Sequence, residues 1–231
     1  MASTAIFIVS LPASATRSYF EQPPSSGSWT LSSISGDGNV ITGMIGTKGS
    51  ERALLWYGTQ GRLIDIGTLN QGNRSLAAGS SHNGEVVVGW AADGAAGNAL
   101  RAFRWTRQDG MVSLGTLNGG PESAAMRSNA SGDVIVGAAG DGQAQNARRV
   151  FRWTTQTGMI SLGTLNGGKT SDNARVNATG DVVVGMSEDG SVNNEVRAFR
   201  WTAQTGMVSL GTLNGGDRSI ASGVNAKGDV V

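Results

Sequence analysis

The chain has 231 residues, of which 36 are glycine and only 15% are charged. Its net charge of +1 excludes the strong positive field that would gather nucleic acid or anionic lipid. Cysteine is absent, which excludes a disulfide framework, a thiol nucleophile and a thiolate metal site.

The N-terminal segment, residues 1–28, allows two interpretations. Ala5–Leu11 is apolar and precedes a small-x-small triplet at Ala13, which is the pattern of a cleaved secretory signal. The apolar run is short and no Lys or Arg precedes it, so a β-strand over Ala5–Leu11 is the preferred interpretation. No other stretch approaches the roughly 20 apolar residues of a membrane helix, and we expect no membrane insertion.

Residues 29–231 form a single repeat domain. Trp56, Trp105, Trp153 and Trp201 are 49, 48 and 48 residues apart. This spacing divides the domain into units at approximately 29–74, 75–122, 123–170 and 171–218, followed by a partial fifth unit at 219–231.

Each unit contains four short segments, which appear in the third unit in the order "SAAMRSNA", "VIVG", "RVFRWT" and "MISLGTL". The segments are rich in Val, Phe, Trp and Thr and are bounded by Gly, Asn and Asp, which is typical of strands. A repeat of about 48 residues that contains four antiparallel strands is typical of a β-propeller blade. We therefore predict an all-β, propeller-like array of four-stranded antiparallel blades with almost no helix.

The side chains also predict the position of each strand in a blade. The first segment is small and polar, which suits the crowded axis, and the valine run suits a strand covered on both faces. In the third segment, alternate residues point the same way, so its aromatic pair is expected to pack against the next blade. The predicted structural core is Trp56, Phe103, Trp105, Phe151, Trp153, Phe199 and Trp201.

The opposite face of the third segment carries an arginine in three units. An arginine between blades needs a partner, and an aspartate recurs in register at the first turn of the units. We predict structural contacts between the arginines and the aspartates. The residues concerned are Arg104, Arg152, Arg200, Asp133, Asp181 and Asp229.

These phrases, from "RAFRWT" through "LGTLNGG" to "VNAxGDVVVG", resemble the HAF repeats of bacterial extracellular proteins. Arg101, Arg149 and Arg197 stand where those repeats have histidine, and the resemblance covers roughly residues 31–231. It implies a secreted or cell-surface location, as in passenger parts of autotransporter-like proteins, and it allows a C-terminal membrane barrel in a longer protein.

The count of four units and a half has two explanations. Either the chain is a piece of a longer protein, or the N-terminal segment supplies strands that close the ring and remove exposed edges. We favour the first explanation, and in both we expect Val230 and Val231 to lie in a strand.

The sequence contains few candidates for catalytic, metal-binding or phosphate-binding residues. His82, the one histidine, occupies a turn position held by alanine in the other units, which favours a surface role over a general base. The glycine-rich "LNGG" phrases precede strands and not helices, so they do not predict phosphate loops. Residues 188–195 miss the spacing of a calcium loop. We expect no catalytic residue, no metal site and no cofactor.

Variation between units gathers in the loops that join strands 2–3 and 4–1, which lie at one end of an antiparallel blade. Variable loops on a rigid scaffold favour a binding surface. The predicted rim residues are Arg74, Trp90, Asp93, Asp141, Lys169, Glu188, Asp189 and Arg218.

Two functional hypotheses follow. The first is a non-enzymatic extracellular or cell-surface module that binds or adheres to a protein or glycan through the rim. The alternative is a polysaccharide-acting hydrolase on a propeller scaffold, which needs two carboxylates about 5–10 Å apart near the axis. An axis lined by Ala, Ser and Asn would favour the binding module. A stalk without a specific ligand is the third interpretation.

Overall fold

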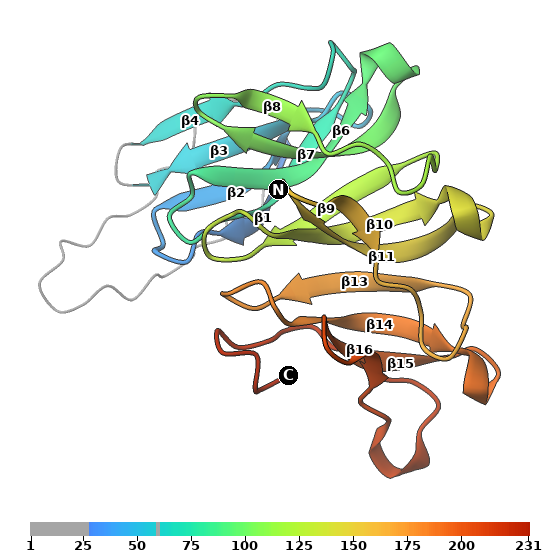
Figure 1. The fold of residues 1–231 in the computed structure, drawn as a ribbon. Helices are drawn as coiled ribbons and strands as arrows, with labels where there is room; N and C mark the ends of the chain where they lie inside the picture. Colours follow the sequence, from blue (N-terminus) through green and yellow to red (C-terminus); the bar gives the residue numbers. More distant parts are fainter. Residues whose placement is uncertain (1–27, 59–60) are drawn as a thin grey trace, which may run out of the picture.

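The computed structural model describes residues 28–58 and 61–231 and builds them mainly from β-strands. Four sheets follow one another along the chain, each with four antiparallel strands hydrogen-bonded in sequence order (Figure 1). Within the described residues, helical structure is limited to short 3-10 turns. The predicted strand at Ala5–Leu11 lies outside the described residues.

We number the four sheets as blades in chain order. Blade 1 contains β1 (Trp29–Ile34), β2 (Val40–Ile45), β3 (Arg52–Tyr57) and β4 (Arg62–Asp65). Blade 2 contains β5 (Ser75–Ser80), β6 (Val86–Asp93), β7 (Ala99–Thr106) and β8 (Gly110–Ser113). Blade 3 contains β9 (Ser123–Ser128), β10 (Ile135–Asp141), β11 (Ala147–Thr154) and β12 (Gly158–Ser161). Blade 4 contains β13 (Ser171–Val176), β14 (Val183–Asp189), β15 (Glu195–Thr202) and β16 (Gly206–Ser209).

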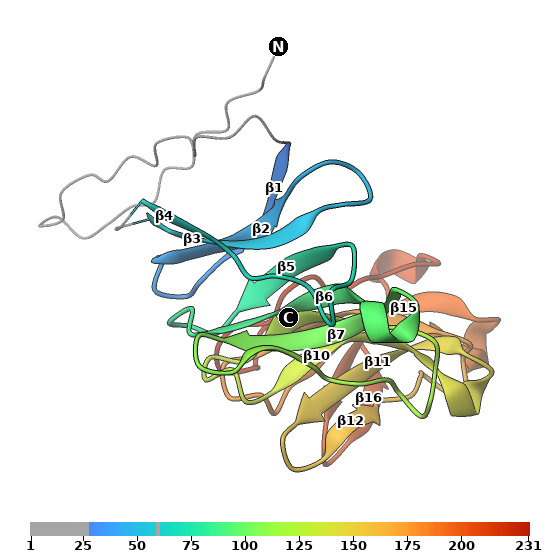
Figure 2. The same cartoon turned by 90° about the horizontal axis from the view of Figure 1, so that it is seen from above.

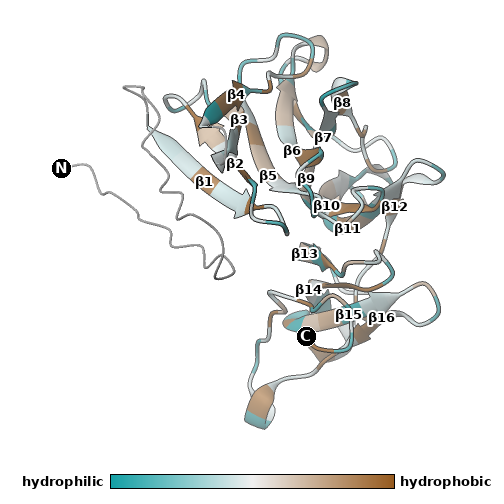
Figure 3. Cartoon of the chain, turned by 90° about the vertical axis from the view of Figure 1, so that its left-hand side faces the viewer, coloured by the Kyte–Doolittle hydropathy of each residue, from teal (hydrophilic) through white to brown (hydrophobic). Residues whose placement is uncertain are grey.

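The blades fan out from a common axis (Figures 2 and 3). The first strands of neighbouring blades, β1, β5, β9 and β13, contact one another, whereas β8, β12 and β16 lie at the periphery. Small residues at the first strands permit this close approach. The predictions of a propeller-like array and of an innermost first segment are confirmed.

Each blade interface is apolar and is built from the two middle strands. Phe103 and Trp105 of blade 2 pack with Val40 and Leu55 of blade 1. On its other face, blade 2 presents Val86 and Val88 to blade 3. The valine run is therefore covered on both faces, as predicted. The aromatic pair faces the preceding blade, so the predicted direction, toward the next blade, was wrong.

Phenylalanine is the most deeply buried aromatic residue of each interface, and at the interface of blades 1 and 2 Trp105 is also buried. Phe103, Phe151 and Phe199 are fully buried, whereas the rings of Trp153 and Trp201 are half-buried. A glycine opposite each phenylalanine makes room for its ring. For example, a β-carbon at Gly137 would lie 2.8 Å from Cζ of Phe151 and 2.1 Å from the carbonyl oxygen of Ala124.

Trp56 occupies a different environment from the other repeat tryptophans. It packs with Ile41 and Leu54 on the face of blade 1 that points away from blade 2. Trp29 contacts it edge to face, with ring centroids 6.3 Å apart. Trp56 is therefore buried within blade 1 and does not join two described blades.

The partial fifth unit covers the outer face of blade 4 without forming a sheet. Ala221 and Val224 pack on Val182 and Val184. Val230 and Val231 are not in a strand, contrary to prediction. In the complete units the equivalent valines pair with the third strand, and residues 219–231 include no counterpart of that strand.

Candidate functional site

In blades 2, 3 and 4, a serine at the start of the first strand connects the blade to the preceding one. Oγ of Ser123 accepts a hydrogen bond from the backbone N–H of Ala102 at 2.9 Å and donates to the carbonyl oxygen of Gly115 at 2.6 Å. Ser75, Ser171 and Ser219 make the equivalent pairs of bonds. The recurrence of these serines at one position is visible in the repeat, but recurrence alone does not predict a hydrogen bond between blades.

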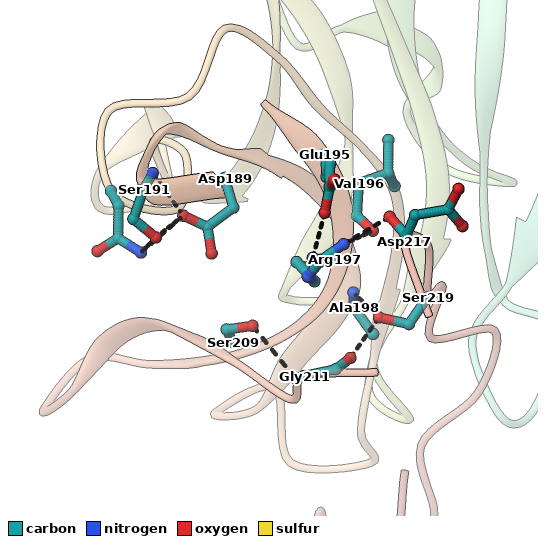
Figure 4. Close-up of polar contacts among 11 residues, drawn as sticks. Asp189, Ser191, Glu195, Val196, Arg197, Ala198, Ser209, Gly211, Asp217 and Ser219 are labelled. Carbon is teal, nitrogen blue, oxygen red and sulfur yellow. Dashed lines mark hydrogen bonds and ion pairs between the residues drawn. The ribbon is translucent and has the colours of Figure 1, made fainter. Parts of the chain in front are cut away.

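The first residue of the segments "RAFRWT" and "RVFRWT" is an arginine that holds the loop between strand 4 and the next blade. Nη1 of Arg197 donates to the carbonyl oxygen of Asp217 at 2.5 Å, and Nη2 contacts Glu195 (Figure 4). Arg101 and Arg149 make the equivalent bonds to the carbonyl oxygens of Pro121 and Lys169. This position is therefore structural.

The "LNGG" phrase forms a latch between consecutive blades. The asparagine has positive φ, 49° at Asn118, which turns the loop toward the next blade. Its side-chain Nδ2 donates to Oδ1 of Asp141 at 2.8 Å. The preceding Leu117 is fully buried, and its carbonyl oxygen accepts the N–H groups of Gly120 and Gly142. Asn70 to Asp93 and Asn166 to Asp189 are the equivalent side-chain bonds.

The aspartate of each latch also organises its own loop. Oδ1 of Asp141 accepts the N–H of Gln143 at 3.0 Å and so caps the 3-10 turn η3 (Gly142–Ala144). Asp93 and Asp189 cap η2 (Gly94–Ala96) and η4 (Gly190–Val192) in the same way. Hydrogen bonds from Ser191 and then Asn166 lower the pKa of Asp189. These three predicted rim residues therefore hold the loops in place, and their carboxylates face inward.

The fourth latch has no following blade among the described residues. Its leucine, Leu213 in η5 (Leu213–Gly215), is 90% exposed, whereas Leu69, Leu117 and Leu165 are 4% exposed or less. The leucine is therefore buried only where the Asp-Gly loop of a following blade covers it.

The other predicted rim residues have mixed roles. The guanidinium of Arg74 stacks on Trp90, with its central carbon 5.7 Å from the ring centroid. Lys169 and Arg218 are exposed. Oε2 of Glu188 is buried and has no hydrogen-bond partner within the described chain. The rim surface proper is formed by the exposed tips of the η2, η3 and η4 loops.

Two of the arginines predicted to contact aspartates reach the turn that contains the aspartate. There they donate to a backbone carbonyl oxygen and not to the aspartate side chain. Nε of Arg152 donates to the carbonyl oxygen of Gly180 at 3.2 Å, and Arg200 contacts that of Gly228. These glycines immediately precede Asp181 and Asp229. Arg104 pairs instead with Asp109, 3.5 Å away.

The aspartates Asp133, Asp181 and Asp229 close their own turns. Oδ1 of Asp133 accepts bonds from Ser131 and Asn129, and these bonds lower its pKa. Asp181 and Asp229 accept the equivalent asparagine bonds from Asn177 and Asn225. At Arg152 and Arg200 a neutral backbone carbonyl therefore takes the place of the carboxylate expected from sequence, whereas Arg104 has an ionic partner at a different aspartate, Asp109.

The turns between strands 1 and 2 lie at the end of the blades opposite the rim. Backbone hydrogen bonds connect these turns from one blade to the next. The N–H of His82 donates to the carbonyl oxygen of Ala130 at 2.9 Å, and the N–H of Ala130 donates to that of Ala178 at 3.1 Å. His82 is exposed and its ring lies over Gly36, as a β-carbon there would fall 2.1 Å from Nδ1. The similar turns "NASGD" and "NATGD" of blades 3 and 4 therefore reflect a structural requirement.

A cavity of about 180 Å³ opens at this turn end of the axis, where all four blades meet. Its lining consists mostly of small or polar residues, and His82 and Val176 are the larger side chains besides the asparagines. The lining residues are Gly36, Ser80, His82, Ser128, Asn129, Ala130, Val176, Asn177 and Ala178. The variable rim and the axial cavity thus lie at opposite ends of the molecule.

The described part of the chain contains no group of three or more His, Asp or Glu side chains that could hold a metal ion. Across residues 28–58 and 61–231, no helix has the length and apolar character needed to span a membrane.

No protein-family model and no curated protein matches the chain. TolB from Acinetobacter baumannii aligns with a TM-score of 0.57 and 13% identity over 81% of this chain and 45% of that protein. A protein described as TolB from Agrobacterium tumefaciens aligns with a TM-score of 0.57 and 16% identity over 77% and 63%. A prolyl endopeptidase aligns with a TM-score of 0.54 and 10% identity over 81% and 29%. The chain spans less than two thirds of these proteins, and the likeness shows the fold alone.

Proposed function

We propose that this chain is a non-enzymatic binding module of the cell exterior or cell envelope, and that it recognises a neutral glycan through its variable rim. The observation that carries the proposal is the combination of fixed loop bases and divergent loop tips. Each tip is held by an aspartate cap and by a latch from the preceding blade.

The tips themselves are exposed, mostly uncharged and different in each blade. Blade 3 presents Gln143 and Gln145, whereas blade 2 has Ala95 and Gly97 at the same positions. Blade 4 has Ser191 and Asn193 there. Amide and hydroxyl groups both donate and accept hydrogen bonds, which matches the hydroxyl groups of a neutral sugar better than a charged ligand. A rigid base keeps the entropic cost of ordering the rim low.

The axial cavity supports binding over hydrolysis. Its lining among the described residues consists of Ser, Asn, Ala, Gly and Val with His82, and not of the carboxylate pair that a glycosidase places about 5–10 Å apart. The resemblance to HAF repeats supports the extracellular or cell-envelope location, and an autotransporter passenger is the corresponding proposal for a longer protein.

A glycan array probed with the fluorescently labelled chain tests this proposal. We expect binding to a subset of neutral glycans, lost when Gln143→Ala is combined with Gln145→Gly. Glycine tolerates the φ of 56° at position 145, so this variant is expected to fold. Gln156→Ala, at an exposed turn of the opposite end, is the matched control and should bind like the parent.

Two results would contradict the proposal. One is an absence of glycan binding, or binding that the rim variant and the control lose equally. The other is the release of new reducing ends from the bound glycans, which would favour the hydrolase.

A further inference from the structure

Glycine directly follows asparagine at four places in the sequence, and three of these steps belong to the same phrase. Asn118, Asn166 and Asn214 each lie in "GTLNGG", and Asn83 precedes Gly84 in the turn between β5 and β6. Glycine has no β-carbon and rotates freely, so its backbone nitrogen can reach the side-chain amide of the preceding asparagine. Each Asn-Gly step is therefore a candidate site of spontaneous deamidation.

The three copies of the phrase share one local geometry. The φ angle is 49° at Asn118, 47° at Asn166 and 50° at Asn214. All three asparagines are exposed, so water reaches each of them. Local sequence, backbone conformation and access to water therefore do not distinguish the copies, and any difference in reactivity must come from the contacts of each latch with the next blade.

In the closed latches the following blade holds the Asn-Gly peptide at two points. Nδ2 of Asn118 donates to Oδ1 of Asp141 at 2.8 Å. A β-carbon on Gly142 would fall 2.0 Å from the carbonyl oxygen of Asn118, so the backbone of blade 3 lies directly against this peptide. Asn166 is held in the same way by blade 4. Because the reaction requires the peptide to rotate, a closed latch must first open locally.

The copy in blade 4 has none of these restraints. The side chain of Asn214 forms no hydrogen bond with the residues that the structure describes. A β-carbon on Gly216 would lie 3.3 Å from the carbonyl oxygen of Leu213 in its own loop, whereas one on Gly120 would fall 1.8 Å from that of Gly140 in the next blade. The peptide after Asn214 can therefore rotate without breaking a contact between blades.

Asn83 is restrained by its own turn. Its Oδ1 accepts hydrogen bonds from Oγ of Ser81 at 2.9 Å and from the N–H of Glu85 at 3.1 Å. Gly84 packs on blade 1, since a β-carbon there would lie 2.3 Å from Cγ2 of Val40. This step is therefore held at the side chain and at the backbone, like the closed latches.

We propose that Asn214 is a site of spontaneous deamidation, and that the fold protects the other three Asn-Gly steps. The backbone nitrogen of Gly215 bonds to Cγ of Asn214, the bond from Cγ to Nδ2 breaks, and the N–H proton leaves with Nδ2 as ammonia. Water then opens the cyclic imide at either carbonyl, which gives aspartate or isoaspartate. Both products carry a carboxylate where a closed latch has an amide that donates to an aspartate. Because like charges repel, the modified copy can no longer close on an Asp-Gly loop.

Peptide mapping by mass spectrometry tests the site after the intact chain has been incubated in mildly alkaline buffer. Trypsin separates the four asparagines, because lysine or arginine lies between each pair. We expect Asn214 to convert roughly tenfold faster than Asn118 and Asn166, whose reaction waits for local opening. The same chain unfolded in guanidinium chloride is the control, and there the three copies should convert at similar rates.

Asp141→Ala removes the partner of Asn118 and leaves the latch of Asn166 intact. It should raise the conversion rate of Asn118 severalfold without changing that of Asn166, and its melting temperature checks that it folds. The proposal is overturned if Asn214 in the folded parent converts no faster than Asn118 or Asn166. An unchanged rate at Asn118 in the variant, or an equal rise at Asn166, would show that the latch is not the source of the protection.

Discussion

Replacing Phe151 by alanine is expected to lower the free energy of unfolding by about 3–5 kcal/mol. The ring is fully buried between blades 2 and 3 and packs with Val86, Val88 and Ile135. Its removal leaves a cavity that cannot collapse, because Gly137 opposite the ring is already in contact with the neighbouring backbone. Urea unfolding followed by tryptophan fluorescence measures the change.

Ile160→Ala is the matched control for this prediction. Ile160 lies on β12 of the same blade and is 37% exposed. Its truncation should cost well below the cost of Phe151→Ala, about 1 kcal/mol or less. Equal costs for the two variants would show that the phenylalanine does not form the centre of the blade interface.

Leu117→Ala is expected to destabilise the chain by about 2–5 kcal/mol, whereas Leu213→Ala should change stability by less than about 0.5 kcal/mol. The two leucines occupy the same position in two copies of "GTLNGG". Leu117 is fully buried under the loop of blade 3, and Leu213 is 90% exposed. The pair therefore compares a closed latch with an open one in the same local sequence.

The midpoint of chemical unfolding, measured for both variants under one set of conditions, gives the comparison. If local sequence alone determined the contribution of this phrase, the two substitutions would have similar effects. A Leu213→Ala loss as large as that of Leu117→Ala would therefore rule out the latch as the source of the stabilisation.

Much of the fold could be predicted from the sequence because the same four-strand pattern occurs in four consecutive repeat units. Short segments bounded by glycine and asparagine identify the strands, and the small residues of segments such as "SAAMRS" identify the innermost one. The direction of packing could not be predicted in the same way. Alternation places Phe103 and Trp105 on one face of β7, but it does not say whether that face meets the preceding or the following blade.

The roles of the rim residues depend on contacts that cross from one blade to the next. Asp141 recurs with Asp93 and Asp189 in variable loops, and this pattern is equally compatible with a ligand site and with a latch. The distinguishing partner, Asn118, is 23 residues away in sequence. The constant "LNGG" text is a sequence signal for this contact between blades, since an asparagine in a left-handed turn is often present for structural reasons.

The axial cavity could not be anticipated because it exists only where the four blades converge. Ser80, Ser128 and Val176 each belong to a different blade, and in sequence they are ordinary residues at the end of a strand. Only the arrangement around the axis brings them together.

Spin-label distances test the radial arrangement most directly, and the absence of cysteine allows labels to be placed freely. One pair of cysteines replaces His82 and Ala178, which line the axial cavity in blades 2 and 4. The other pair replaces Val112 and Val208, which are exposed at the outer strands of the same blades. Blades that fan from an axis predict a clearly shorter distance for the inner pair than for the outer pair. Equal distances would mean that the repeats stack along a line, and they would contradict the account.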